Sequence, residues 1–81
     1  MTIVVKFFAL ARDLTGVDEK VLTLPESATV AHVIEALVTQ YPRFSDWKDH
    51  LRVAVNCEYV PLRHTLHQDA EVAIIPPVSG G

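Results

Sequence analysis

The sequence has little from which a catalytic or secreted domain is usually built. Its 81 residues include one cysteine, Cys57, and no uninterrupted apolar run longer than Phe7–Ala11. A single cysteine excludes the disulfide framework that small secreted domains usually need. So short an apolar run excludes a membrane span and the apolar region of a signal peptide. We therefore expect a cytoplasmic protein with no membrane partner.

Positive charge is also scarce and scattered. Seven lysines and arginines stand against ten acidic residues, which gives a formal net charge of −3, and the basic residues occur singly along the chain. Nucleic-acid binding needs a basic stripe or patch, so we expect no nucleic-acid partner. The phosphate-binding loop, the dinucleotide fingerprint and the Cys-x-x-Cys pair are all missing. An enzyme that acts on its own is not expected.

The titratable side chains do not suggest a metal or nucleophile site. His64 and His67 lack the further ligands that a zinc site needs. His32 and His50 have no serine or cysteine partner at a recognisable spacing. Cys57 is predicted to face the core as a small buried side chain. No metal and no directly bound cofactor are therefore expected.

Alternating and helical apolar patterns predict one α+β domain over residues 1–75. Strand patterns cover residues 3–10, 20–24, 52–57, 59–60 and 71–75, and a short helical turn over 9–15 ends at Gly16. The main helix spans about 30–41, with Ser27 or Thr29 as N-cap and Pro42 after it, and its apolar residues form one stripe. Residues 42–50 are predicted to be a polar connection that contains Trp47.

This order of elements predicts a mixed sheet with one main helix packed on one face. The compact solution is a β-grasp, or ubiquitin-like, roll. The opposite face is left open, and Lys6 and Glu71 mark it as the side exposed to water. The alternation places an apolar cluster there, which is a predicted docking surface. Its members are Phe8, Ala73, Ile75 and Tyr59, with Lys6, Arg52 and Glu71 at the rim.

The last residues, 76–81, read Pro-Pro-Val-Ser-Gly-Gly. Pro76 and Pro77 end the preceding strand and favour an extended tail. Gly80 and Gly81 add little to a fold but leave the terminal carboxylate free of side chains, so that it can enter a narrow active site. A carboxylate needs activation before it can react, most simply as an acyl-adenylate formed from ATP on another protein. The activated Gly81 carbonyl would then accept sulfur, an amine or a thiol; a frayed end without function is the simpler alternative.

The whole chain resembles the small, sulfur-carrier subunit of molybdopterin synthase, the MoaD-type family. The segments that carry the resemblance are Val5–Ala9, Ala11–Gly16, Thr29-Val30, Val55-Asn56 and, above all, Asp69–Gly81. Related ubiquitin-like carriers share the final diglycine more often than the Pro-Pro-Val-Ser before it.

The resemblance implies that a MoeB-type activating enzyme uses ATP to adenylate Gly81, which is then converted to a thiocarboxylate. The loaded tail would enter the MoaE-type large subunit of a heterotetrameric synthase and donate sulfur to cyclic pyranopterin monophosphate. Gly80 would give the tail access. The partner surface would consist of Phe8, Tyr59, Ile75, Pro76, Pro77 and Val78. A sulfur carrier for thiamine synthesis or tRNA thiolation, a ubiquitin-like conjugation or interaction module, and a plain structural subunit are the alternatives.

Overall fold

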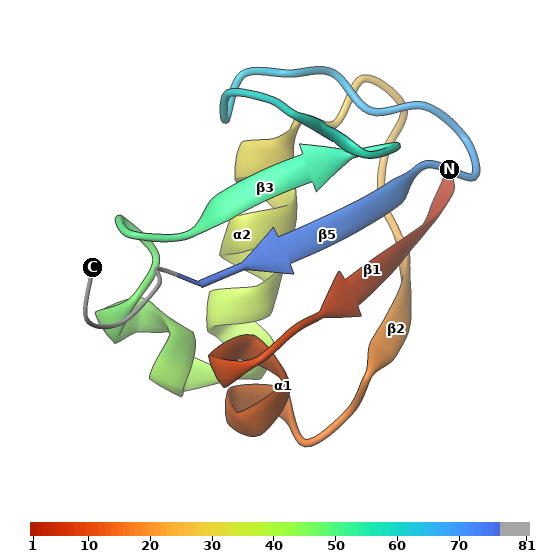
Figure 1. Cartoon of the computed structure of the whole chain (residues 1–81). Coiled ribbons are helices and arrows are strands. Elements are labelled where there is room, and N and C mark those ends of the chain that lie inside the picture. Colours follow the sequence, from red (N-terminus) through yellow and green to blue (C-terminus); the bar gives the residue numbers. More distant parts are fainter. Residues whose placement is uncertain (77–81) are drawn as a thin grey trace.

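A computed structural model describes residues 1–76 of the chain (Figure 1). Along the sequence the elements are β1 (Thr2–Phe7), α1 (Leu10–Thr15), β2 (Glu19–Thr23), α2 (Val30–Gln40), the 3-10 helix η1 (Pro42–Asp46), β3 (Arg52–Val55), β4 (Glu58–Tyr59) and β5 (Glu71–Ile75). Among these described residues, no helix has both the length and the apolar character to cross a membrane.

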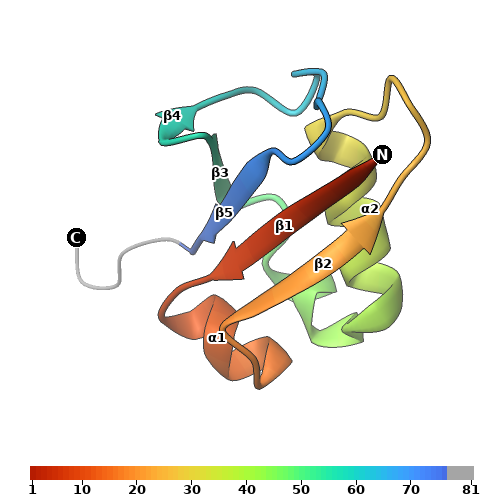
Figure 2. The ribbon, with the colours of Figure 1, turned by 90° about the vertical axis from the view of Figure 1, so that its right-hand side faces the viewer.

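The five strands form one mixed sheet in the order β2-β1-β5-β3-β4. The two central neighbours, β1 and β5, run parallel, and every other pair is antiparallel. Helix α2 lies across one face of this sheet, as the two views in Figures 1 and 2 show. The predicted α+β architecture, with one main helix on one sheet face, is therefore confirmed.

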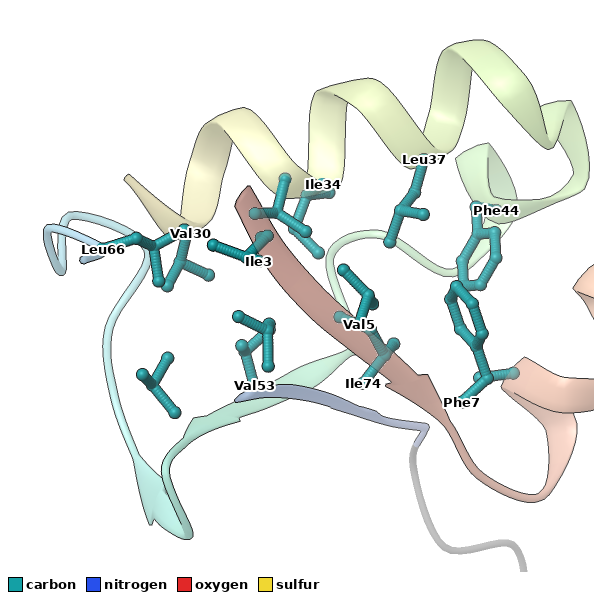
Figure 3. Packing of buried hydrophobic residues seen from close by; sticks show 14 of the residues in the cluster. Ile3, Val5, Phe7, Val30, Ile34, Leu37, Phe44, Val53, Leu66 and Ile74 are labelled. Carbon is teal, nitrogen blue, oxygen red and sulfur yellow. The ribbon is translucent and has the colours of Figure 1, made fainter. Parts of the chain in front are cut away.

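The core fills the space between α2 and the sheet. Strand β1 alternates as predicted: Ile3, Val5 and Phe7 are at most 3% exposed, whereas their neighbours are partly exposed. Side chains from α2 point toward these strand residues in Figure 3. The period-2 pattern of the strand and the apolar stripe of the helix thus meet in one cluster. Its fully buried members include Ile3, Val5, Val30, Val33, Leu37, Phe44, Leu66, Val72 and Ile74.

Helix α2 begins with a capping box in which a histidine replaces the usual glutamate. Thr29, one of the two predicted candidates, is the N-cap, and its backbone N–H donates to Nδ1 of His32 at 2.8 Å. His32 is exposed at the third helical position, so its ring reaches back along the first turn. The side chain therefore has a local structural role that sequence spacing did not reveal.

The connection between α2 and β3 contributes more to the core than its polar sequence indicates. Phe44, in η1, has no exposed surface. Its ring centroid lies 6.2 Å from that of Phe7 and 6.3 Å from that of Tyr41, distances typical of paired aromatic rings. Trp47 is partly buried against the same cluster. The prediction of a polar connection over residues 42–50 was wrong for Phe44, because the 3-10 helix η1 directs its ring inward.

The prediction that Cys57 faces the core was also wrong. Strand β3 ends at Val55, and a two-residue turn with φ of 50° at Asn56 and 73° at Cys57 leads directly into β4. Two consecutive positive φ angles define the tight hairpin turn that normally carries Asn-Gly. Cys57 therefore occupies the glycine position of this turn, and its side chain is exposed.

Replacing Cys57 by glycine should stabilise the domain by about 1 kcal/mol, because glycine adopts a positive φ without the steric cost that a Cβ imposes. Urea denaturation followed by circular dichroism measures the change. Cys57→Ala is the matched control, since it removes the thiol but keeps the Cβ, and it should leave stability unchanged. Equal stabilisation by both variants would show that the thiol, and not the backbone, is responsible.

Candidate functional site

The face of the sheet opposite α2 carries the predicted docking surface. Register partners on neighbouring strands point to the same face, and one row of partners runs Lys6, Ala73, Ala54, Tyr59 across β1, β5, β3 and β4. Two positions along the β3–β5 ladder, and therefore on the same face, Ile75 pairs with Arg52. The topology thus brings together residues from both halves of the sequence, as the alternation predicted.

Phe8 is the residue on this surface whose position depends most on local backbone geometry. It follows β1 directly and is 49% exposed, whereas Phe7 before it is 3% exposed. The next residue, Ala9, has φ 48° and ψ −123°, and the Ala11 N–H donates to the Phe8 carbonyl at 3.0 Å. This is a tight turn with a non-glycine residue at positive φ, a conformation that costs about 1–3 kcal/mol. The turn separates the exposed Phe8 from the buried start of α1.

Tyr59 and Ile75 form the other apolar part of the surface. Tyr59 is 64% exposed and Ile75 is partly buried. The guanidinium of Arg52 lies 5.8 Å from the centre of the Tyr59 ring, which is a cation–π distance. Because Phe7 pairs with Ile74 in the parallel ladder, Phe8 follows the end of β1 at the same end of the sheet at which Ile75 ends β5. We call the set Phe8, Tyr59, Ala73 and Ile75 the docking surface.

An ion pair divides the open face. Lys6 Nζ lies 3.5 Å from Glu71 Oε2, and both side chains are more than a third exposed. Such a pair adds little stability because water screens it. Beyond it lies a second apolar pair, Val4 and Val21, in which Val21 is 61% exposed. The sequence reasoning missed this pair, since only the β1–β2 register shows that Val21 belongs to the open face.

The docking surface adjoins the root of the C-terminal tail. Strand β5 ends at Ile75, and Pro76 after it is buried. Phe8, Tyr59 and Ile75 are thus available for contact, whereas Pro76 offers little surface. The predicted tail residues Pro77, Val78, Gly80 and Gly81 lie outside the described residues 1–76. Figures 1 and 2 show the ends of β1 and β5 side by side.

These features define the class of the protein. A mixed sheet with parallel central strands, one helix across one face and an apolar surface beside the end of the last strand is the architecture of a ubiquitin-like protein. Within residues 1–76, no three His, Cys, Asp or Glu side chains gather closely enough to hold a metal ion.

Comparison of the sequence with known proteins identifies the family of this chain. The ThiS family matches residues 5–81. The molybdopterin synthase sulfur carrier subunit of Arabidopsis thaliana is 37% identical over 77 residues, which cover 95% of this chain and 80% of that protein. The chain therefore belongs to the ThiS family and is related within it to molybdopterin synthase sulfur carrier subunits.

Solved structures agree on the fold. SAMP1 from Haloferax volcanii is 29% identical and superposes with a TM-score of 0.88 over 100% of both chains. A chain from the complex of subunits 1 and 2 of the molybdopterin-converting factor of Helicobacter pylori superposes with a TM-score of 0.70, also over 100% of both chains. At 18% identity, this second likeness shows the shared fold alone.

Two adjacent phenylalanines allow a direct test of the face assignment. Phe7→Ala should destabilise the domain by about 3–5 kcal/mol, because it empties a packed position in the core. Phe8→Ala should change stability by less than about 0.5 kcal/mol, because the ring is half exposed and outside the core. Thermal and urea unfolding measure both variants. Similar losses for the two would contradict the assignment of Phe8 to the open face.

Proposed function

We propose that this chain is the sulfur carrier of molybdenum cofactor biosynthesis and that its Gly81 carboxyl carries the sulfur. The observation that supports the proposal most strongly is the position of the docking surface, which lies beside the end of β5 and therefore at the root of the Gly-Gly tail. A partner that holds Phe8 and Ile75 has the terminal residues within reach of its active site. Family membership supplies the chemical context.

The chemistry requires two partner proteins. On a MoeB-type activating enzyme, an oxygen of the Gly81 carboxylate attacks the α-phosphorus of ATP, and pyrophosphate leaves. A sulfur nucleophile at the sulfide level then attacks the acyl carbon and displaces AMP, which produces the thiocarboxylate. No oxidant is needed in these two steps, because the carbonyl carbon keeps its oxidation state.

Sulfur transfer takes place on the MoaE-type large subunit. The thiocarboxylate sulfur is delivered to cyclic pyranopterin monophosphate, and water restores the Gly81 carboxylate. Two such deliveries build the dithiolene that will hold molybdenum. The chain's own contributions are a docking surface and an unhindered terminus, and it binds no cofactor. The relative in Arabidopsis thaliana is named as a subunit of molybdopterin synthase, which supports an assembly with a second subunit.

A second candidate function is protein modification, in which the activated Gly81 forms an isopeptide bond with a lysine. The likeness to SAMP1, which is named small archaeal modifier protein 1, supports this candidate at a TM-score of 0.88 over the full chain. Docking and activation would be the same in both cases. The two functions differ in the nucleophile that receives the acyl group.

Intact mass spectrometry distinguishes the two. After reaction with the activating enzyme, ATP and a sulfide donor, the chain should gain the mass difference between one sulfur and one oxygen. Adducts on lysine side chains, with no such gain, would support protein modification instead.

Deleting Gly81 should abolish this mass gain and leave the unfolding temperature unchanged, because the buried core lies within residues 3–74. Mass spectrometry and a thermal melt of the same sample check both statements. A truncated chain that still acquires sulfur would contradict the proposal, as would a deletion that unfolds the domain.

A further inference from the structure

A shallow hollow of about 260 Å³ lies at the β4 edge of the sheet, next to the docking surface. Two of the most exposed large apolar side chains line it: Tyr59 at 64% and Leu62 at 54%. Its remaining lining residues are Leu51, Arg52, Val53, Val60 and Pro61. Exposed apolar side chains that gather around a hollow are typical of a contact site and uncommon on a surface without a partner.

The backbone that presents Leu62 is held on several sides. The Leu62 carbonyl accepts a hydrogen bond from the Ala31 N–H at 2.9 Å, in the first turn of α2. The N–H of His64 donates to the Pro61 carbonyl at 3.0 Å, and the N–H of Val60 donates to the Val53 carbonyl at 3.0 Å. A partner that covers Leu62 therefore has little backbone entropy left to remove, which favours affinity.

Arg52 gives the hollow a charge. Its guanidinium lies 5.8 Å from the centre of the Tyr59 ring, and the residue is exposed. Within residues 1–76 the ion pairs are Lys6 with Glu71 and Arg12 with Asp18, so neither involves Arg52. An exposed guanidinium offers N–H donors in the plane of the group, where a carboxylate fits. The hollow thus combines an apolar wall with a cation.

The hollow is continuous with the docking surface. Tyr59 belongs to both, and Arg52 pairs with Ile75 in the β3–β5 ladder. From Ile75, at the end of β5, a partner reaches the β4 edge by way of Arg52 and Tyr59, whereas the ion pair of Lys6 and Glu71 joins β1 to β5. The same partner can therefore occupy both regions.

We propose that this hollow receives a segment of the synthase large subunit in which an apolar side chain stands next to an aspartate or glutamate. The apolar side chain packs between Tyr59 and Leu62, and the carboxylate accepts hydrogen bonds from Arg52. This inference rests on the proposed function and extends the contact beyond Phe8, Tyr59 and Ile75. Leu62 and Arg52 become determinants of partner affinity.

Isothermal titration of the full chain with the purified large subunit of molybdopterin synthase from the same organism tests the inference. Leu62→Ser should raise Kd about tenfold, as expected for an apolar contact at an interface. Arg52→Gln should raise Kd and make it less dependent on salt concentration, because a charge pair is lost. The matched control is Val21→Ser, at an equally exposed apolar residue on the far strand β2, and Kd should change by less than about twofold.

The binding results of the variants and of the wild-type chain show whether the inference alone fails or the proposed function fails with it. If Phe8→Asp prevents binding but Leu62→Ser and Arg52→Gln bind like the wild type, the hollow is not part of the interface and the proposed function stands. If the wild-type chain does not bind the large subunit, both are wrong. The remaining alternative is that a second copy of the chain occupies the hollow. Sedimentation velocity of the chain alone tests it, because a wild-type dimer that Leu62→Ser dissociates would assign the hollow to the second copy. Thermal melts of each variant confirm that the fold is retained.

Discussion

The parallel pairing of β1 with β5 is the constraint on which the rest of this structure depends. It joins the first strand to the last, with Val4 opposite Glu71 and Phe7 opposite Ile74. Because parallel strands have their C-terminal ends on the same side of a sheet, the C-terminal ends of β1 and β5 lie together. An antiparallel arrangement would place the root of the tail at the opposite end of the sheet from Phe8. Phe8 and the end of β5 are neighbours for this reason.

The two paired central strands also keep the residues of the core on a different face from the residues that are exposed. Side chains alternate between the two faces of each central strand, so one face supplies the core under α2 and the other remains available to a partner. Phe7 and Phe8 show the consequence: of two adjacent residues of the same type, one is buried in the core and the other is half exposed. The strained turn at Ala9 allows Phe8 to leave the strand while Ala11 returns to the core. The surface can therefore change to suit a partner with little effect on the fold.

Sequence patterns predicted those features that depend on regular periodicity. Charged residues at Lys6 and Glu71 were enough to assign the faces of both central strands, and the helix was evident from its apolar stripe. The patterns failed where irregular backbone decides orientation. Phe44 lies in a polar segment whose 3-10 helix has no recognisable apolar periodicity. Cys57 was assigned to the alternation of residues 52–57, but it lies in a turn with positive φ, where that alternation has ended. Val21 required the register between two strands, which a single strand's sequence does not contain.

Transfer of the sulfur atom itself is the central claim, and isotope labelling tests it most directly. The chain is loaded at Gly81 with a heavy sulfur isotope and mixed with the large subunit and cyclic pyranopterin monophosphate in a single turnover, with no other sulfur source. The account predicts that the heavy sulfur appears in the pterin product while the chain returns to the mass of its free carboxylate form. Heavy sulfur that stays on the chain, with an unchanged pterin, would contradict it.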